Sequence, residues 1–283
     1  MPVSAVRAAL VTGCSTGIGR ATALALDSRG FTVYATARRP ETLADLGARR
    51  IRTLALDVDD EASMVAAVDA VEAAHGHVAV LVNNAGYALQ GPVEETPIDA
   101  VRAQFQTNVF GLVRLTQLVL PAMRAAHDGR IINIGSMGGR FTFPGGGFYH
   151  ASKHAVEAIS DALRLEVAPF GVHVSLVQPG PVRSAFVDAA VGSMEEAPDS
   201  AYADFRRDIT DRMHQAYDGS RTNLEVTPEK VAEVIVSAAT SSRPRARYAV
   251  GAMARTLITS RRLLPDVAWD QVMKAAWPTP KAD

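Results

Sequence analysis

Three polar side chains in this chain have spacings suited to proton transfer. Tyr149 and Lys153 are four residues apart, and Ser136 lies 13 residues before Tyr149. Positions i and i+4 of a helix share a face, so the phenol and the ammonium could act together, with the positive charge favouring the phenolate. A serine at the end of a preceding strand could hydrogen-bond the oxygen that the tyrosine protonates. The trio therefore predicts acid–base chemistry on a carbonyl or an alcohol.

A glycine-rich turn near the N-terminus suggests the partner for this chemistry. Gly13, Gly17 and Gly19 follow an apolar strand candidate and open a helix candidate. Glycine lets the backbone approach a pyrophosphate closely, and a helix N-terminus offers its N–H groups to phosphate. The spacing G-x-x-x-G-x-G differs from the commoner G-x-G-x-x-G, and alone it could be an ordinary strand–helix turn. After a first strand it predicts dinucleotide binding and, with Tyr149, hydride transfer with a nicotinamide.

The residues after the second strand candidate bear on cofactor choice. An acidic side chain there would accept a bond from the adenosine ribose 2′-hydroxyl and favour NAD. The chain has Ala37, Arg38 and Arg39 instead, and arginines form charge-assisted bonds to a 2′-phosphate. NADP(H) is therefore the expected cofactor, although solvated surface arginines would give the same pattern. Asp57, after the third strand candidate, is expected to accept from the adenine amino group or to lie near a helix N-terminus.

Composition argues against several other classes of protein. Of the 283 residues, 48% are hydrophobic and 21% charged, and the formal net charge is -1. We therefore expect a large buried core and no nucleic-acid partner. The lone cysteine, Cys14, excludes an internal disulfide and a cysteine metal cluster. His150 and His154 have i,i+4 spacing without a recognisable third ligand, so no metal site is predicted.

The sequence shows no recognisable secretion or membrane signal. The N-terminus lacks a charged segment followed by an apolar one. The longest apolar candidate, residues 110–126, contains Arg114, Pro121 and Arg124. Together with the cysteine count, these features predict a cytoplasmic protein without membrane contact.

Short apolar runs alternate with longer amphipathic segments along the chain. This alternation predicts an α/β fold, a doubly wound (Rossmann) parallel sheet of seven strands with helices on both faces. The expected strands are residues 8–11, 32–35, 53–56, 78–82, 131–134, 172–177 and 247–250. The expected helices are residues 18–28, 61–74, 101–126, 149–169 and 228–239.

We expect residues 1–283 to form one dinucleotide-binding and catalytic domain. The charged insertion 185–226 is expected to be a lid over a substrate cleft, with a plain surface helix as the alternative. Residues 252–283 are expected to be a helical extension that packs on the core. A subunit contact and a membrane-surface patch are its alternatives.

From Ala8 to about Gly251 the chain resembles a single-domain short-chain dehydrogenase/reductase. The motifs that carry the resemblance are residues 12–19, residues 83–86, Asn108, Ser136, Tyr149 with Lys153, and Pro179-Gly180. The loop around Cys14, Ala37-Arg38 and residues 135–139 are most similar to the NADP-preferring 17β-hydroxysteroid and retinol dehydrogenase branch.

The resemblance implies roles for these residues. Asn108 would anchor a water that leads protons to Lys153, and Lys153 would bind the nicotinamide ribose. The catalytic set is then Asn108, Ser136, Tyr149 and Lys153. The expected cofactor-binding residues are Gly13, Ser15, Thr16, Gly17, Ile18, Gly19, Arg38, Arg39, Asp57, Val58, Asn84, Ala85, Gly86, Tyr149, Lys153, Pro179, Gly180, Val182 and Ser184. We also expect a homodimer or homotetramer.

The predicted function is NADP(H)-dependent hydride transfer to or from a small hydrophobic ketone, aldehyde or secondary alcohol. An apolar substrate is expected because several large apolar residues lie in segments that could line the cleft. The expected cleft segments are residues 87–90, 141–148 and 185–226, and their large apolar residues are Leu89, Phe141, Phe143, Phe148, Phe186 and Val187. The alternative is a non-catalytic NADP-binding, redox-sensing regulator on the same fold. The presence of all four catalytic residues favours the enzyme.

Overall fold

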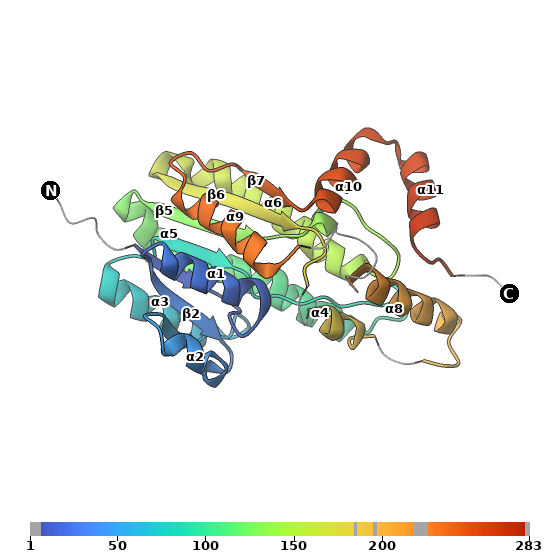
Figure 1. Ribbon diagram of the computed structural model, residues 1–283, viewed down its shortest axis with the longest axis horizontal. Coiled ribbons are helices and arrows are strands. Elements are labelled where there is room, and N and C mark those ends of the chain that lie inside the picture. The colour runs from blue at the N-terminus through green and yellow to red at the C-terminus, as the bar shows by residue number, and fades with distance from the viewer. Residues whose placement is uncertain (1–6, 184–185, 195–196, 218–225, 281–283) are drawn as a thin grey trace.

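Seven parallel strands form the scaffold of the molecule (Figure 1). The computed structural model describes residues 7–183, 186–194, 197–217 and 226–280. Its strands lie in the order β3-β2-β1-β4-β5-β6-β7, and the chain reverses direction across the sheet between β1 and β4. Their bounds are β1 (Ala8–Val11), β2 (Thr32–Ala37), β3 (Arg52–Ala55), β4 (Val80–Asn83), β5 (Gly129–Ile134), β6 (Val172–Pro179) and β7 (Arg247–Val250). The doubly wound fold is confirmed, and each strand lies close to its predicted position.

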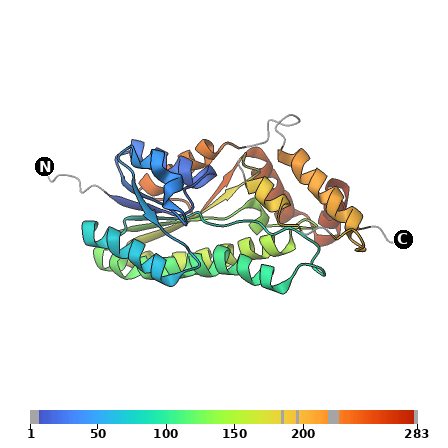
Figure 2. The ribbon, with the colours of Figure 1, turned by 90° about the horizontal axis from the view of Figure 1, so that it is seen from below.

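Helices cover both faces of the sheet (Figure 2). Residues of β1 alternate between the two core layers, with Val11 facing one and Leu10 facing the other. On the first face lie α1 (Gly17–Ser28) and α9 (Pro228–Thr240), and on the second lie α3 (Glu61–His75), α5 (Leu112–Ala126) and α6 (Gly147–Val167). The strands are therefore buried on both faces, which explains why their sequences are almost continuously apolar.

Helix α6 carries Tyr149 and Lys153 and is fixed to the sheet by buried polar contacts. Asn133 Nδ2 on β5 donates to Ser160 Oγ at 2.9 Å, and Asn83 Nδ2 on β4 donates to Asn133 Oδ1 at 2.9 Å. The buried carboxylate of Glu157 accepts from Arg247 Nε on β7 at 2.9 Å. Sliding α6 along the sheet would unpair these groups at about 1–3 kcal/mol each. The helix is thereby held in one register against the strand ends.

One helical stretch, Ile98–Ala126, is long and apolar enough to cross a membrane by length and composition alone. It comprises α4 (Ile98–Phe105), the π-helical turn η2 (Gln106–Gly111) and α5. Its α5 part places Leu115, Val119 and Met123 in the same core layer as Leu10, on the second face of the sheet. The apolar character of this part of the stretch therefore serves packing against the strands.

The insertion and the C-terminal extension are both helical and lie at the same end of the molecule (Figures 1 and 2). The insertion forms α7 (Phe186–Val191) and α8 (Ala203–Tyr217), and the extension forms α10 (Ala252–Leu263) and α11 (Asp266–Ala276). Trp269 of α11 packs against Phe141, with ring centroids 5.4 Å apart. The extension thus packs on the loop that precedes α6, as expected. Movement of the insertion as a lid stays a prediction.

Candidate active site

A cavity of about 1390 Å³ lies at the carboxyl ends of the strands and joins most of the predicted site residues. It runs from the glycine loop past the α6 side chains to the insertion and the extension. The predicted residues that line it are Gly13, Ser15, Thr16, Gly17, Ile18, Arg38, Asp57, Val58, Asn84, Ala85, Gly86, Ser136, Tyr149, Lys153, Pro179, Gly180 and Val182. Gly19, Arg39 and Asn108 lie outside its lining, and Ser184 lies outside the described residues.

The glycine loop has the backbone geometry of a phosphate cradle. Gly13 and Gly17 adopt φ values of 69° and 57°, which disfavour residues with a side chain. A Cβ at Gly19 would lie 2.3 Å from the Gly13 carbonyl oxygen, so only glycine lets the loop cross the start of α1. Thr16 precedes α1 without a side-chain capping bond, which leaves the first N–H groups of the helix for an anion. These features fit the pyrophosphate of a dinucleotide.

Thr12 and Asn84 tie the glycine loop to the end of β4. Asn84 Nδ2 donates to the carbonyl oxygens of Thr12 and Gly13 at 2.9 and 3.1 Å. The Thr12 hydroxyl accepts from the backbone N–H groups of Asn84 and Ala85, both at 2.9 Å. Thr12 was not among the predicted site residues. Its position at the end of an apolar strand, directly before the first glycine, is the signal that could have found it.

The adenosine end of the cavity is bordered by the residues that follow β2 and β3. Arg38 is exposed and lines the cavity, whereas Arg39 is exposed and does not. Among the described residues, no carboxylate forms an ion pair with Arg38. Asp57 is half-buried, and its Oδ1 accepts from the backbone N–H of Asp59 at 3.1 Å. Both Arg38 and Asp57 therefore stand where a nucleotide could reach them.

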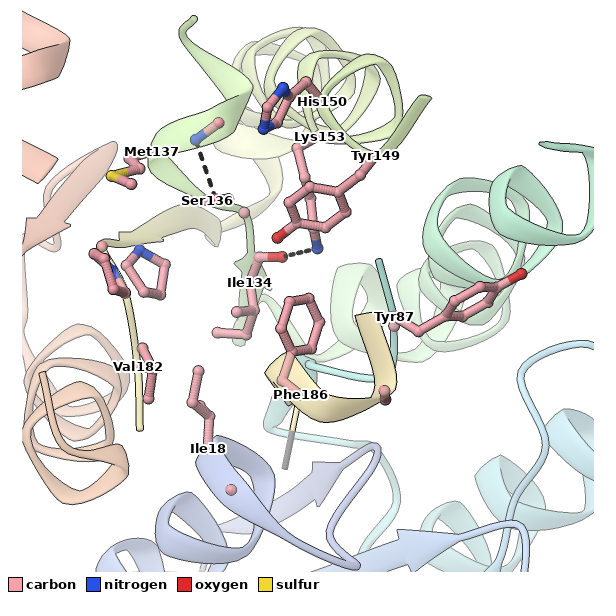
Figure 3. A pocket seen from close by; sticks show the side chains of 18 of the residues that line it. Ile18, Tyr87, Ile134, Ser136, Met137, Tyr149, His150, Lys153, Val182 and Phe186 are labelled. Atoms are coloured by element: carbon pink, nitrogen blue, oxygen red, sulfur yellow. Dashed lines mark hydrogen bonds between the residues drawn. The ribbon is translucent and has the colours of Figure 1, made fainter. Parts of the chain in front are cut away.

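Tyr149, Lys153 and Ser136 converge at the end of β5 (Figure 3). Lys153 Nζ donates to the Ile134 carbonyl oxygen at 2.9 Å and lies 5.8 Å from the centroid of the Tyr149 ring. Ser136 Oγ accepts from the Gly138 N–H at 3.0 Å, so its own proton remains for another acceptor. The three residues whose spacing predicted acid–base chemistry therefore lie together in the structure as one constellation.

Burial sets the protonation of this constellation. It raises the pKa of the Tyr149 phenol to about 12, opposed in part by the Ser136 hydroxyl. It also lowers the pKa of the Lys153 ammonium to about 8. The sequence predicted that the Lys153 charge would favour the phenolate, but desolvation by burial is the larger effect on the Tyr149 pKa. Tyr149 is accordingly placed to act as a proton donor.

Asn108 lies beside the constellation rather than in the cavity wall. Its Oδ1 accepts from the backbone N–H of Tyr87 at 3.0 Å, and its Nδ2 donates to Ser152 Oγ at 3.1 Å. A Cβ at Gly86 would lie 2.8 Å from Asn108 Oδ1 and 3.8 Å from Lys153 Nζ. The π-helical turn therefore brings Asn108 near Lys153, while its part in a proton path stays a prediction.

The substrate end of the cavity combines predicted and unexpected residues. Phe141, Phe143 and Phe186 line it as expected, whereas Leu89 and Phe148 do not. Gln90, Arg212 and Met213 also line it, and they lie in segments expected to contribute to the cleft. Lining residues outside those segments include His150, Met273 and Trp277, and the last two belong to the extension, which the sequence places far from the catalytic helix. Only the position of His150, next to Tyr149, signalled proximity in advance.

The chain is similar to proteins of one family over most of its length. Residues 7–195 match the family described as short chain dehydrogenase. The chain is 38% identical to the 3-ketodihydrosphingosine reductase of Bacteroides thetaiotaomicron over 259 residues, which cover 91% of this chain and 93% of that protein. It is 39% identical to human 17-beta-hydroxysteroid dehydrogenase type 1 over 274 residues, which cover 90% of this chain and 78% of that protein.

A solved structure is also similar to this chain over nearly its whole length. A short-chain dehydrogenase from Streptomyces avermitilis matches with a TM-score of 0.80 and 37% identity, over 97% of this chain and 99% of that one. The confirmed fold, the glycine cradle and the Ser136–Tyr149–Lys153 constellation agree with these likenesses. The chain therefore belongs to the short-chain dehydrogenase/reductase family of oxidoreductases, which bind a nicotinamide cofactor.

Proposed function

We propose that this chain is an NADP(H)-dependent oxidoreductase that reduces hydrophobic ketones or aldehydes and, in the reverse direction, oxidises the corresponding alcohols, secondary alcohols in the case of ketones. The observation that carries the proposal is the continuity of the cavity. One hollow connects the phosphate cradle at Gly13 and Gly17 to Tyr149 and continues to an apolar end. A cofactor and a carbonyl compound could therefore occupy it together, side by side.

The cofactor supplies the hydride when bound, and the protein residues handle the proton. Tyr149 keeps its proton at neutral pH because burial raises the pKa of its hydroxyl to about 12, and it donates that proton to the carbonyl oxygen. Ser136 donates a hydrogen bond to the same oxygen and stabilises the charge that develops there. Lys153, within the same pocket wall, stabilises the phenolate that results.

The preference for NADP(H) rests on Ala37 and Arg38. Ala37 stands where a carboxylate would accept from the ribose 2′-hydroxyl and repel a 2′-phosphate. Arg38 borders the same part of the cavity and has no carboxylate partner among the described residues. A guanidinium at this position would favour a 2′-phosphate through charge-assisted hydrogen bonds.

The apolar end of the cavity supports a hydrophobic substrate. Phe141, Phe143, Phe186, Met213 and Met273 line it. Two relatives are named for a ketodihydrosphingosine and a hydroxysteroid, which is consistent with a carbonyl or hydroxyl on an apolar skeleton. The alternative, a redox-sensing regulator, has no evident use for this space beyond the cofactor cradle.

Replacing Tyr149 by phenylalanine tests the reaction class. Tyr149→Phe should lower kcat for ketone reduction by about 100- to 10,000-fold, because only the proton donor is lost. The dissociation constant for NADPH should stay within a few-fold of that of the wild type. Tyr87→Phe is the matched control, since it removes another hydroxyl from the cavity wall. Near-normal turnover by Tyr149→Phe would refute the assigned role.

The pH dependence of activity tests Lys153. Its ammonium is present below a pKa of about 8 and is lost as the pH rises through that value. We expect kcat/KM for reduction to fall above roughly pH 8, because this parameter reports ionisations of the free enzyme. Lys153→Met should have low activity without that inflection. A wild-type profile that is flat to pH 10 would contradict the assignment.

Isothermal titration with both cofactors tests the role of Arg38. Arg38→Ala should weaken NADPH binding by about 10- to 150-fold and leave NADH binding nearly unchanged, because only the 2′-phosphate loses a charge-assisted bond. Arg39→Ala is the matched control, since Arg39 is also exposed but does not line the cavity. Equal losses for NADPH and NADH would show that Arg38 does not read the 2′-phosphate.

A further inference from the structure

The substrate end of the cavity contains an arginine, Arg212, that forms no ion pair with any residue the structure describes. Arg212 of α8 lines this end together with Met213, Met273 and Trp277. Within the described part of the chain, no carboxylate lies within ion-pair distance of its guanidinium. The neighbouring arginines of the same helix differ, because Arg206 pairs with Glu95 and Arg207 pairs with Asp204. Arg212 thus differs from these two arginines because it lines the cavity and has no carboxylate partner in the described residues.

The guanidinium of Arg212 is held in place without using its terminal amino groups. Its Nε donates to the Ala276 carbonyl oxygen at 2.9 Å, and its central carbon lies 5.4 Å from the centroid of the Trp277 ring. These contacts come from the C-terminal extension and fix the plane of the group. No protein acceptor in the described residues bonds the two terminal nitrogens. The planar donor pair that suits an oxyanion therefore stays available.

An aromatic wall connects Arg212 to the catalytic helix. Trp277 stacks on Phe143 with ring centroids 3.8 Å apart, and Phe143 meets the ring of His150 edge-on at 4.3 Å. His150 directly follows Tyr149 on α6. An apolar chain or ring system lying along this wall would have its carbonyl at Tyr149 and its far end at Arg212.

We propose that Arg212 binds an anionic group, such as a carboxylate, sulfonate or phosphate, at the end of the substrate remote from the reacting carbonyl. The proposal rests on the reductase function above and narrows its substrate class to amphiphilic carbonyl compounds. A half-buried cation beside Met213, Met273 and Trp277, without a carboxylate partner in the described residues, favours a ligand that brings a negative charge, because such pairs are stronger where the local dielectric is low. A remote ion pair of this kind should act on substrate binding rather than on the chemical step.

A purely structural role for Arg212 predicts a different outcome. If Arg212 only links α8 to Ala276 and so stabilises the cavity wall, its replacement would lower kcat/KM for every substrate alike. As an anion site, its loss would affect only the charged substrate. Neutral and charged versions of one compound therefore separate the two roles.

The test compares oxo fatty acids of graded chain length, each with its ketone next to the terminal methyl group, with their methyl esters. The wild type should reduce the acid of best-fitting length with a kcat/KM about 10- to 150-fold above that of its ester, mainly through KM. Arg212→Met should abolish this preference by removing the advantage of the acid over its ester. Arg212→Lys should keep part of it, because the charge remains but the planar donor pair is lost.

Arg207→Met is the matched control, since it removes a charge from the exposed side of the same helix. It should keep the wild-type preference. Equal wild-type kcat/KM values for acid and ester would overturn the inference while leaving the reductase function intact. An equal fall of both values in Arg212→Met would do the same.

Binding of acid and ester to the NADP⁺-loaded protein is titrated in parallel, so the inference is decided even without turnover. Tighter binding of the acid that Arg212→Met removes would support the anion site, and equal binding would overturn it. If neither compound nor a neutral hydrophobic ketone were reduced, the proposed reductase function would fail separately.

Discussion

The ammonium of Lys153 is a buried cation with one protein acceptor, the Ile134 carbonyl oxygen at 2.9 Å. Among the described residues no carboxylate pairs with it. Burying a charge in this way is unfavourable, and the cost is visible as a pKa lowered to about 8. The fold maintains the arrangement because α6 is fixed elsewhere, through Ser160 and Glu157. The Lys153 ammonium is thus held at the end of β5 by the position of α6 rather than by an ion pair in the described residues.

The same constraint explains the protonation of Tyr149. Its hydroxyl shares the buried environment, and desolvation keeps it neutral. The neutral phenol suits proton donation in the reductive direction. In the oxidative direction the phenol must lose its proton, and the Lys153 ammonium would favour that loss. Burial, rather than the i,i+4 neighbour alone, therefore determines how the Tyr149–Lys153 pair works.

Much of the fold and of the cofactor end was predictable because the signals there are local. Short apolar runs located the strands, and the glycines after β1 marked the cradle. The rest depends on tertiary contacts. Thr12 acquires its role only because β1 and β4 are neighbours. Trp277 reaches the cavity only because the extension folds back onto Phe143. Phe148, one residue before Tyr149 on α6, projects in a different direction and so does not line the cavity.

The central claim is that one cavity brings the cofactor and a carbonyl compound together for direct hydride transfer. The most direct measurement uses NADPH deuterated at both C4 positions of the nicotinamide ring, a hydrophobic ketone, and mass spectrometry of the alcohol. We expect one deuterium on the carbinol carbon and a hydroxyl proton taken from solvent through Tyr149. An alcohol whose carbinol hydrogen comes from water, or NADPH oxidation without any alcohol, would contradict the account.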